Sequence, residues 1–294
     1  MENTTIQSNN RSETVKKVTH IATYTIIYIL LIGGSLMMFF PYLWMVMTSL
    51  KTNPEAANTL QLTLFPKVFQ WKNYVEVWQK VDILIGLKNT VLIEISVIPV
   101  GTFVTAMAAF SFAKLKLIGK NFFLLLLMSG MMVPYAALLL PQYRVFSSLN
   151  MIDTLWPLIL PGFFGNISMM FFFVQYMRGI PSSLFEAAKI DGAGYFAQYV
   201  RIMLPLLGPA LAAQIVFWFV GIWNDYFAPS VYLSVNEEMT LQVILGKLNS
   251  SIGTGNNLPL VMAGAVLSSL PLYIIYICFQ RFFIESMAIT GIKG

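Results

Sequence analysis

Six long apolar segments dominate the chain, and each is close to the roughly 20 residues that a helix needs to cross a bilayer. They lie near residues 21–48, 89–112, 122–141, 155–177, 208–233 and 259–284. The segments are continuous, whereas the strands of a membrane barrel alternate over about ten residues. The pattern therefore predicts an all-α membrane protein with six transmembrane helices.

Prolines interrupt several of these segments. Pro134 lies in the third, Pro157 and Pro161 lie in the fourth, and Pro41 and Pro99 lie inside the first two. A proline removes a backbone hydrogen bond and kinks a helix, and neighbouring helices can satisfy the freed groups. We therefore expect several of the spans to be bent.

Composition supports a membrane protein, because 57% of the residues are hydrophobic and only 11% are charged, against about 25% charged in soluble domains. The first apolar segment is longer than the core of a cleavable signal peptide, so it is predicted to be a retained span. We expect a tail over 1–20, one membrane domain over 21–284 and a second tail over 285–294. The single cysteine, Cys278, allows no disulfide within the chain.

The distribution of Lys and Arg predicts the orientation. If the N-terminus is cytoplasmic, the short loop 114–120 (KLKLIGK) and the region around 186–205 are cytoplasmic as well. The cytoplasmic segments then hold most of the Lys and Arg residues. Six spans place both termini on that side. The net charge of +5 is then explained by topology and gives no reason to expect nucleic acid binding. The outer loop 49–88 is expected to form short amphipathic helices.

Enzyme chemistry has few candidate residues here. His20 is the only histidine, and no phosphate-binding GxxxxGK[ST] string or metal-binding cluster occurs. We expect no catalytic residues, no metal site and no cofactor. Only Glu94 and Asp225 lie at plausible membrane depth, whereas ion-driven carriers usually place several charged groups there, so any transport would draw its energy from elsewhere.

The two membrane-depth carboxylates have different expected settings. Glu94 sits about a turn into the second predicted span, which favours a position at the outer surface. Asp225 stands beside Trp223, Asn224 and Tyr226, and this combination of aromatic and polar groups suits the lining of a translocation path. An interfacial position for Asp225, or a contact across a dimer, remains an alternative.

The stretch EAAKIDGAGYFAQYVRIMLP, residues 186–205, is polar between two spans. Ser183 and Glu186 fit a capping box, and Gly192 and Gly194 allow a turn. The stretch therefore predicts a short helix, a glycine turn and a second helix, whose Phe196, Val200 and Met203 share one face. Ala187 and Ala188 leave a shallow surface that could receive a soluble partner. An ordinary connector is the alternative.

The spacing of this stretch resembles a known motif. Glu-Ala-Ala is followed by three residues, Gly192, nine residues, Ile202, one residue and Leu204-Pro205, which is similar to the EAA loop of permease subunits in binding-protein-dependent ABC importers. Further strings resemble the carbohydrate-uptake group, above all the second permease of maltose-type importers: TSLKTNPE (48–55), FPKVFQWKNY (65–74), NT (89–90), IWNDYFAP (222–229), TLQ (240–242) and QRFFIESMAITGIKG (280–294).

The resemblance implies a transport subunit without catalysis of its own. The implied partners are a sister permease, two ATPase subunits, an extracellular sugar-binding protein, the sugar and membrane lipid. ATP hydrolysis in the ATPase would drive alternating access. By this resemblance the elements that contact the ATPase are Glu186, Ala187, Ala188, Asp191, Gly192 and Gly194, and those of the C-terminal tail are Thr290, Gly291, Lys293 and Gly294. Two alternatives remain: a membrane scaffold or channel without ATP coupling, and an importer for another solute such as a peptide.

Overall fold

Helices and their connections form the whole described part of the chain, which contains no β-strand. The computed structural model describes the backbone except at residues 1, 59, 62, 252–256 and 292–294, and the side chains of 20–248 (apart from 59 and 62) and 257–281. The elements are α1 (Glu2–Ser49), α2 (Asn53–Ala57), α3 (Lys72–Lys80), α4 (Ile83–Lys114), α5 (Lys120–Gly130), α6 (Tyr135–Ser148), α7 (Trp156–Phe163), α8 (Ile167–Arg178), α9 (Ser183–Ile190), α10 (Tyr195–Gln198), η1 (Tyr199–Met203), α11 (Leu204–Leu206), α12 (Gly208–Trp223), α13 (Phe227–Tyr232), η2 (Asn236–Glu238), α14 (Leu241–Ser251) and α15 (Leu258–Gly291).

Four helical segments of the described chain are long and apolar enough to cross a membrane: His20–Ser49, Ile83–Lys114, Trp156–Arg178 and Leu258–Arg281. They correspond to the first, second, fourth and sixth predicted spans. Two further candidates are bent pairs of helices, so the number rises to six if each pair is one span. The prediction of an all-helical fold is therefore confirmed for the described residues, with four to six candidate membrane spans.

The third predicted span, 122–141, is not one straight helix. It consists of α5 and α6, which meet at 90°. Pro134 has an extended conformation (φ −59°, ψ 130°) directly before α6, and a proline there has no N–H to continue the helix. The expected interruption at Pro134 is thus a sharp corner.

The fifth predicted span, 208–233, ends earlier than expected. Helix α12 stops at Trp223, and a separate short helix, α13, follows. Asp225 Oδ1 accepts a hydrogen bond from the Ala228 N–H at 3.2 Å, so this side chain satisfies a free donor at the start of α13 instead of allowing α12 to continue. At its other end, α12 meets the segment 195–206 at 80°.

The helix α4 lies at the centre of the packing, against α7, α8, α12 and α14. Its C-terminal half joins a buried cluster that includes Phe110 of α4, Phe173 and Met177 of α8, and Leu207. Its other half holds the chain between η2 and α14, because Asn89 Nδ2 donates to the Glu237 and Met239 carbonyls and the Leu241 N–H donates to Thr90 Oγ1 at 3.0 Å. This helix therefore connects the two ends of the molecule.

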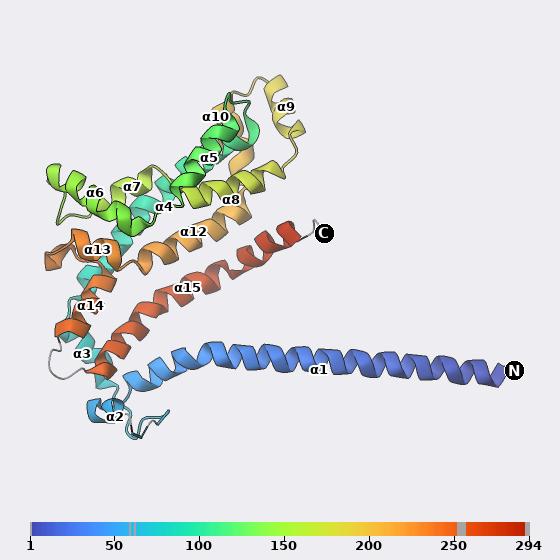
Figure 1. Ribbon diagram of the computed structural model, residues 1–294, viewed down its shortest axis with the longest axis horizontal. Helices are drawn as coiled ribbons and strands as arrows, with labels where there is room; N and C mark the ends of the chain where they lie inside the picture. Colours follow the sequence, from blue (N-terminus) through green and yellow to red (C-terminus); the bar gives the residue numbers. More distant parts are fainter. Residues whose placement is uncertain (1, 59, 62, 252–256, 292–294) are drawn as a thin grey trace.

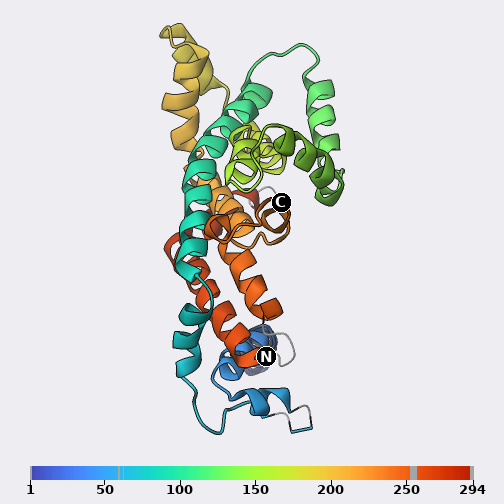
Figure 2. The same ribbon diagram turned by 90° about the vertical axis from the view of Figure 1, so that its left-hand side faces the viewer.

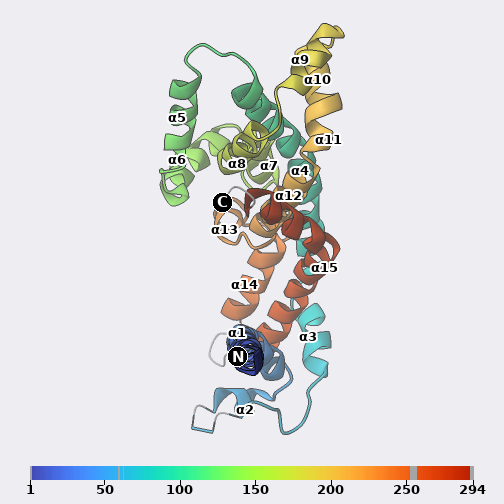
Figure 3. The same ribbon diagram turned by 90° about the vertical axis from the view of Figure 1, so that its right-hand side faces the viewer.

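The outer loop forms the expected short helices, α2 and α3. Asn73 and Val77 of α3 are buried, while Trp71 and Trp78 are exposed. Asn73 Nδ2 donates to the Ser49 and Lys51 carbonyls at 2.7 and 3.0 Å, which ties α3 to the end of α1. Figures 2 and 3 show α2 and α3 at one end of the molecule and α9, α10 and α11 at the other.

The helix α1 extends away from the remaining helices, as Figure 1 shows. It contacts α15 near its own C-terminal end, where the rings of Tyr42 and Tyr273 lie 5.2 Å apart. None of the residues in its most apolar stretch is buried. In Figure 1 the start of α1 lies at the right, α9 lies at the top, and α2, α3 and α14 lie at the left.

We predict that Gly101→Ala destabilises the packing of α4 on α7. An added Cβ at Gly101 would overlap with the Trp218 ring and the Gly162 carbonyl oxygen, and overpacking typically costs about 1–3 kcal/mol. Thermal unfolding of the detergent-purified chain should shift to lower temperature. The matched control is Gly33→Ala on α1, where no atom lies within 4 Å of the new Cβ. Equal unfolding temperatures for both variants would contradict this account of the packing.

Candidate functional site

The segment from α9 to α11 projects at one end of the molecule (Figures 1 and 3). The predicted helix, glycine turn and second helix are all present. The second helix is longer than expected, because α10 continues through the π-helical turn η1 into α11 and ends at Leu206. The segment therefore ends at the 80° bend that precedes α12.

The start of α9 differs from the predicted capping box. Ser182 occupies the N-cap position with helical angles, and no side chain makes a capping hydrogen bond there. The amide groups of Phe185 and Glu186 instead donate to the Ser182 carbonyl at 3.0 and 3.1 Å. Because Ser182 is already helical, the turn begins one residue earlier than predicted and the assignment of Ser183 and Glu186 as a capping box is wrong.

The end of α9 explains Gly192. This residue has a φ of +83°, in the left-handed region that disfavours residues with a Cβ. The Ala193 N–H donates to the Ala188 carbonyl at 2.8 Å, and the Gly192 N–H donates to the Lys189 carbonyl at 3.1 Å, which is the Schellman arrangement. By contrast, Gly194 has an extended conformation that any residue can adopt.

The two alanines of the motif face different ways. Ala187 is exposed, together with Glu186, Asp191, Gly192 and Gly194, whereas Ala188 is buried with an exposed fraction of 8%. The exposed set forms an outer surface on α9 and its turn, which we call the coupling surface. The sequence interpretation did not include the exposed apolar residues Leu184 and Ile190 of α9.

The second helix turns a different face inward than expected. Met203 is buried, but Phe196 and Val200 are exposed, and Tyr199 is fully buried. The π-helical turn Tyr199–Met203 has more residues per turn than an α-helix, so the spacing that placed Phe196 and Val200 on the buried face does not apply. The prediction for those two residues is wrong.

Two aromatic side chains fasten the segment to α4. The Phe185 ring lies 5.8 Å from the Phe110 ring and 5.5 Å from Lys114 Nζ. The Tyr199 hydroxyl donates to the Phe103 carbonyl at 2.7 Å, and its ring packs against the Phe103 ring at 5.3 Å. Both contacts bury large apolar surfaces, so α9 cannot move far without moving α4.

The four residues proposed for a translocation path do not converge. Trp223 is buried, stacks on Phe219 at 5.5 Å and donates from Nε1 to the Ser268 carbonyl at 2.9 Å. Asn224 and Tyr226 are exposed. Asp225 lines a small cavity with Tyr135, Gln142 and Thr240, whereas Trp223 lines a separate hollow.

That cavity has a volume of about 120 Å³, and its polar lining comes from α6 and from the connections that precede α13 and α14. The lining residues are Ile93, Tyr135, Gln142, Pro157, Leu158, Pro161, Ile222, Asp225, Ala228, Pro229 and Thr240. Thr240 Oγ1 is buried and has no hydrogen-bond partner among the described residues. The cavity suits a few hydrogen-bonding atoms, since sites for whole ligands usually measure about 300–1,000 Å³.

Glu94 lies deeper than the sequence suggested. Helix α4 begins at Ile83, so Glu94 stands about three turns into it, and its exposed fraction is 4%. The expected position at the outer surface is therefore wrong, because the span begins earlier than the apolar pattern indicated.

A comparison with family models matches residues 98–289 to the binding-protein-dependent transport system inner membrane components. The chain belongs to this family of transport permeases. The matched range contains the whole segment from α9 to α11, and α12.

Curated relatives of this permease agree with the match. It is 32% identical to the arabinooligosaccharides transport system permease protein AraQ of Halalkalibacterium halodurans over 91% of this chain and 96% of that protein. It is 28% identical to the maltodextrin transport system permease protein MalD of Streptococcus pneumoniae over 92% of this chain and 96% of that protein.

A solved structure supports the fold of the permease. The chain superposes with a TM-score of 0.75 on a chain of a bacterial ABC transporter involved in the import of the acidic polysaccharide alginate, with 23% identity, covering 88% of this chain and 96% of that one. Of the residues predicted for the contact of the tail with the ATPase, Lys293 and Gly294 lie outside the described residues. Thr290 and Gly291 lie at the end of α15, where side chains are not described.

We predict that Gly192→Ala loosens the end of α9 in this permease. A Cβ in the left-handed region costs roughly 1–2 kcal/mol, which corresponds to roughly 5- to 30-fold faster local opening. Hydrogen–deuterium exchange of a peptide containing the Ala193 amide should show this acceleration. Gly194→Ala is the control and should leave exchange unchanged, because its φ is −66°. If the two variants exchange alike, the Schellman arrangement does not hold this turn.

Proposed function

We propose that this permease is the membrane subunit of an ABC importer that moves a sugar or oligosaccharide across the cytoplasmic membrane by ATP-driven alternating access. Family membership supports a transport role, and the names of the relatives support a sugar, since they refer to arabinooligosaccharides and maltodextrin. ATP hydrolysis would take place in separate subunits. The chain itself would contribute the path and the moving parts.

The observation that carries this proposal is the coupling surface on α9. It combines small, exposed residues on a short helix with two aromatic anchors, Phe185 and Tyr199, beneath it. A soluble ATPase could approach the small residues closely, and a push on α9 would reach α4 through the anchors. Such a joint transmits a rigid-body movement, which is what alternating access requires.

The remaining assignments follow from this arrangement. We infer six spans, with each bent pair of helices counted as one, and cytoplasmic termini. The proposed division is a tail over 1–20, the permease domain over 21–284 and a tail over 285–294, although α1 and α15 run through both boundaries as continuous helices. The proposed assembly contains a sister permease, two ATPase subunits and an extracellular sugar-binding protein.

Asp225 is the best candidate in this chain for a contact with the transported solute. Of the four residues first considered, it alone lines the small polar cavity with Tyr135, Gln142 and Thr240. Carboxylate, amide and hydroxyl groups are suited to sugar hydroxyls. At about 120 Å³, the cavity would offer single contacts during passage and would not enclose a sugar.

We predict that Ala187→Trp prevents docking of the ATPase. Ala187 is exposed on the coupling surface, so a bulky side chain would hold the two proteins apart without disturbing this chain. In co-purification with the sister permease and a sugar-importer ATPase, the retained ATPase should fall at least about tenfold, which corresponds to roughly 1.4 kcal/mol, while the sister permease is still retained.

Two controls make the docking experiment specific. Ile118→Trp adds the same bulk to another exposed position, with an exposed fraction of 99%, in the loop 114–120, and should retain the ATPase. Ala188→Trp would disturb the chain itself, because Ala188 is buried, and is therefore less informative. Normal ATPase retention by Ala187→Trp would refute the coupling surface.

We predict that the reconstituted complex takes up oligosaccharides only with ATP and the binding protein. Proteoliposomes that contain both permeases and the ATPase should accumulate labelled maltodextrin or arabinooligosaccharide against a gradient, and the omission of ATP should reduce uptake to background. Equal flux without ATP would instead indicate a channel. ATP-dependent uptake of a peptide, but of neither sugar, would indicate an importer for another solute.

A further inference from the structure

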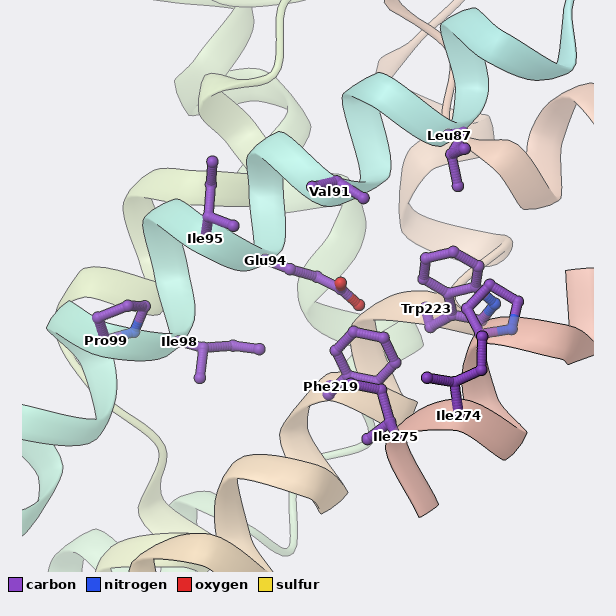
Figure 4. A pocket seen from close by; sticks show the side chains of 11 residues that line it. Leu87, Val91, Glu94, Ile95, Ile98, Pro99, Phe219, Trp223, Ile274 and Ile275 are labelled. Atoms are coloured by element: carbon purple, nitrogen blue, oxygen red, sulfur yellow. The ribbon is translucent and has the colours of Figure 1, made fainter. Parts of the chain in front are cut away.

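Glu94 is a buried carboxylic acid without a visible partner. It projects from α4 toward Phe219 and Trp223 of α12, as Figure 4 shows. Its exposed fraction is 4%, and Oε1 has no hydrogen-bond partner among the described residues. A buried polar group normally has such a partner, and an ionisable residue at membrane depth is usually functional.

The side chain lies in a hollow of about 480 Å³ between α4, α12 and α15. The lining is otherwise apolar: Leu87, Val91, Ile95, Ile98, Pro99, Phe219, Trp223, Pro271, Ile274 and Ile275. The one other polar atom nearby, Trp223 Nε1, already donates to the Ser268 carbonyl. Glu94 therefore offers the hollow a single free hydrogen-bonding group.

This lining is unsuited to a sugar and to a lipid tail. A sugar carries several hydroxyl groups, each of which needs a partner when it leaves water, and the hollow supplies one. A lipid acyl chain would match the apolar walls but brings no donor for Glu94. The best match is an apolar helix that carries one hydrogen-bond donor, such as a serine, asparagine or lysine side chain.

The hollow adjoins a side of the chain that is uncovered. Ile274 and Ile275 of α15 line it, and the neighbouring Tyr273 packs against Tyr42 of α1. The apolar stretch of α1 has no buried residue. Apolar faces of this kind suit either lipid or protein, and the unpartnered Oε1 of Glu94 favours protein at the hollow. The proposed importer supplies such a surface in the sister permease.

We propose that a membrane-spanning helix of the sister permease covers this hollow and donates a hydrogen bond to Glu94. The inference rests on the proposed function, because that function provides the sister permease. Glu94 would then act as a specificity element of the permease pair, since a wrong partner without the donor leaves the acid unsatisfied.

The first test compares Glu94→Leu and Glu94→Gln in the full complex. Leucine leaves the donor of the partner unpaired, so the sister permease retained through a detergent wash should fall at least fivefold. Glutamine keeps an acceptor oxygen, so retention should recover toward that of the wild type. For this chain purified alone, Glu94→Leu should raise the unfolding temperature, because an orphaned acid is removed.

These opposite effects make the test decisive. If Glu94 has no partner in the complex either, Glu94→Leu should stabilise the single chain and leave assembly unchanged. This outcome would overturn the proposal. If the wild-type complex takes up sugar with ATP and Glu94→Leu assembles normally, the inference fails and the proposed function stands. If the wild-type chain pairs with no sister permease, both fail.

The second test identifies the occupant directly. A photo-reactive amino acid at Ile274, whose exposed fraction is 61% at the hollow, should crosslink to the sister permease in membranes. The same probe at Phe122 of α5, an exposed apolar position outside the hollow, gives the background. An adduct with lipid alone, with the sugar or with a second copy of this chain would overturn the proposal.

Discussion

The attachment of the segment α9–α11 to α4 is the contact on which the proposed mechanism depends. Phe185 and Tyr199 bury their rings against Phe103 and Phe110, and the Tyr199 hydroxyl also bonds the Phe103 carbonyl. Packed aromatic surfaces resist sliding because each ring fills a shaped space. Since α4 packs against helices at both ends of the core, a displacement of α9 would be carried toward the opposite end in the proposed mechanism.

The bends of the helices are stable because nearby side chains satisfy the broken backbone. Between α7 and α8 the Asn166 N–H donates to Thr105 Oγ1 at 2.9 Å, and the Asn166 side chain accepts the Met169 N–H at 3.0 Å. Asp225 Oδ1 likewise accepts a hydrogen bond from the Ala228 N–H at the start of α13. Irregular backbone at membrane depth is tolerated where protein groups provide such partners, so Thr105, Asn166 and Asp225 stabilise the bends of these helices.

Several motif residues that indicated the family have structural roles here. Asn73 ties the outer loop to the end of α1, and Asn89 and Thr90 hold the connection between η2 and α14. A side-chain amide can replace a missing backbone partner in such connections. Glu94 differs from them, because its acid has no such partner within the described chain.

Hydropathy and motif spacing are local properties of the chain, so the amino-acid sequence alone predicts the membrane class, the positions of most spans and the EAA-like motif. Three features required the three-dimensional structure: Ala188 faces inward while Ala187 faces outward, α12 ends at Trp223, and Glu94 is buried. Burial depends on helices that are distant in sequence, and no local pattern contains their positions. For the same reason, only the three-dimensional structure shows that Trp223 and Asp225 line different cavities.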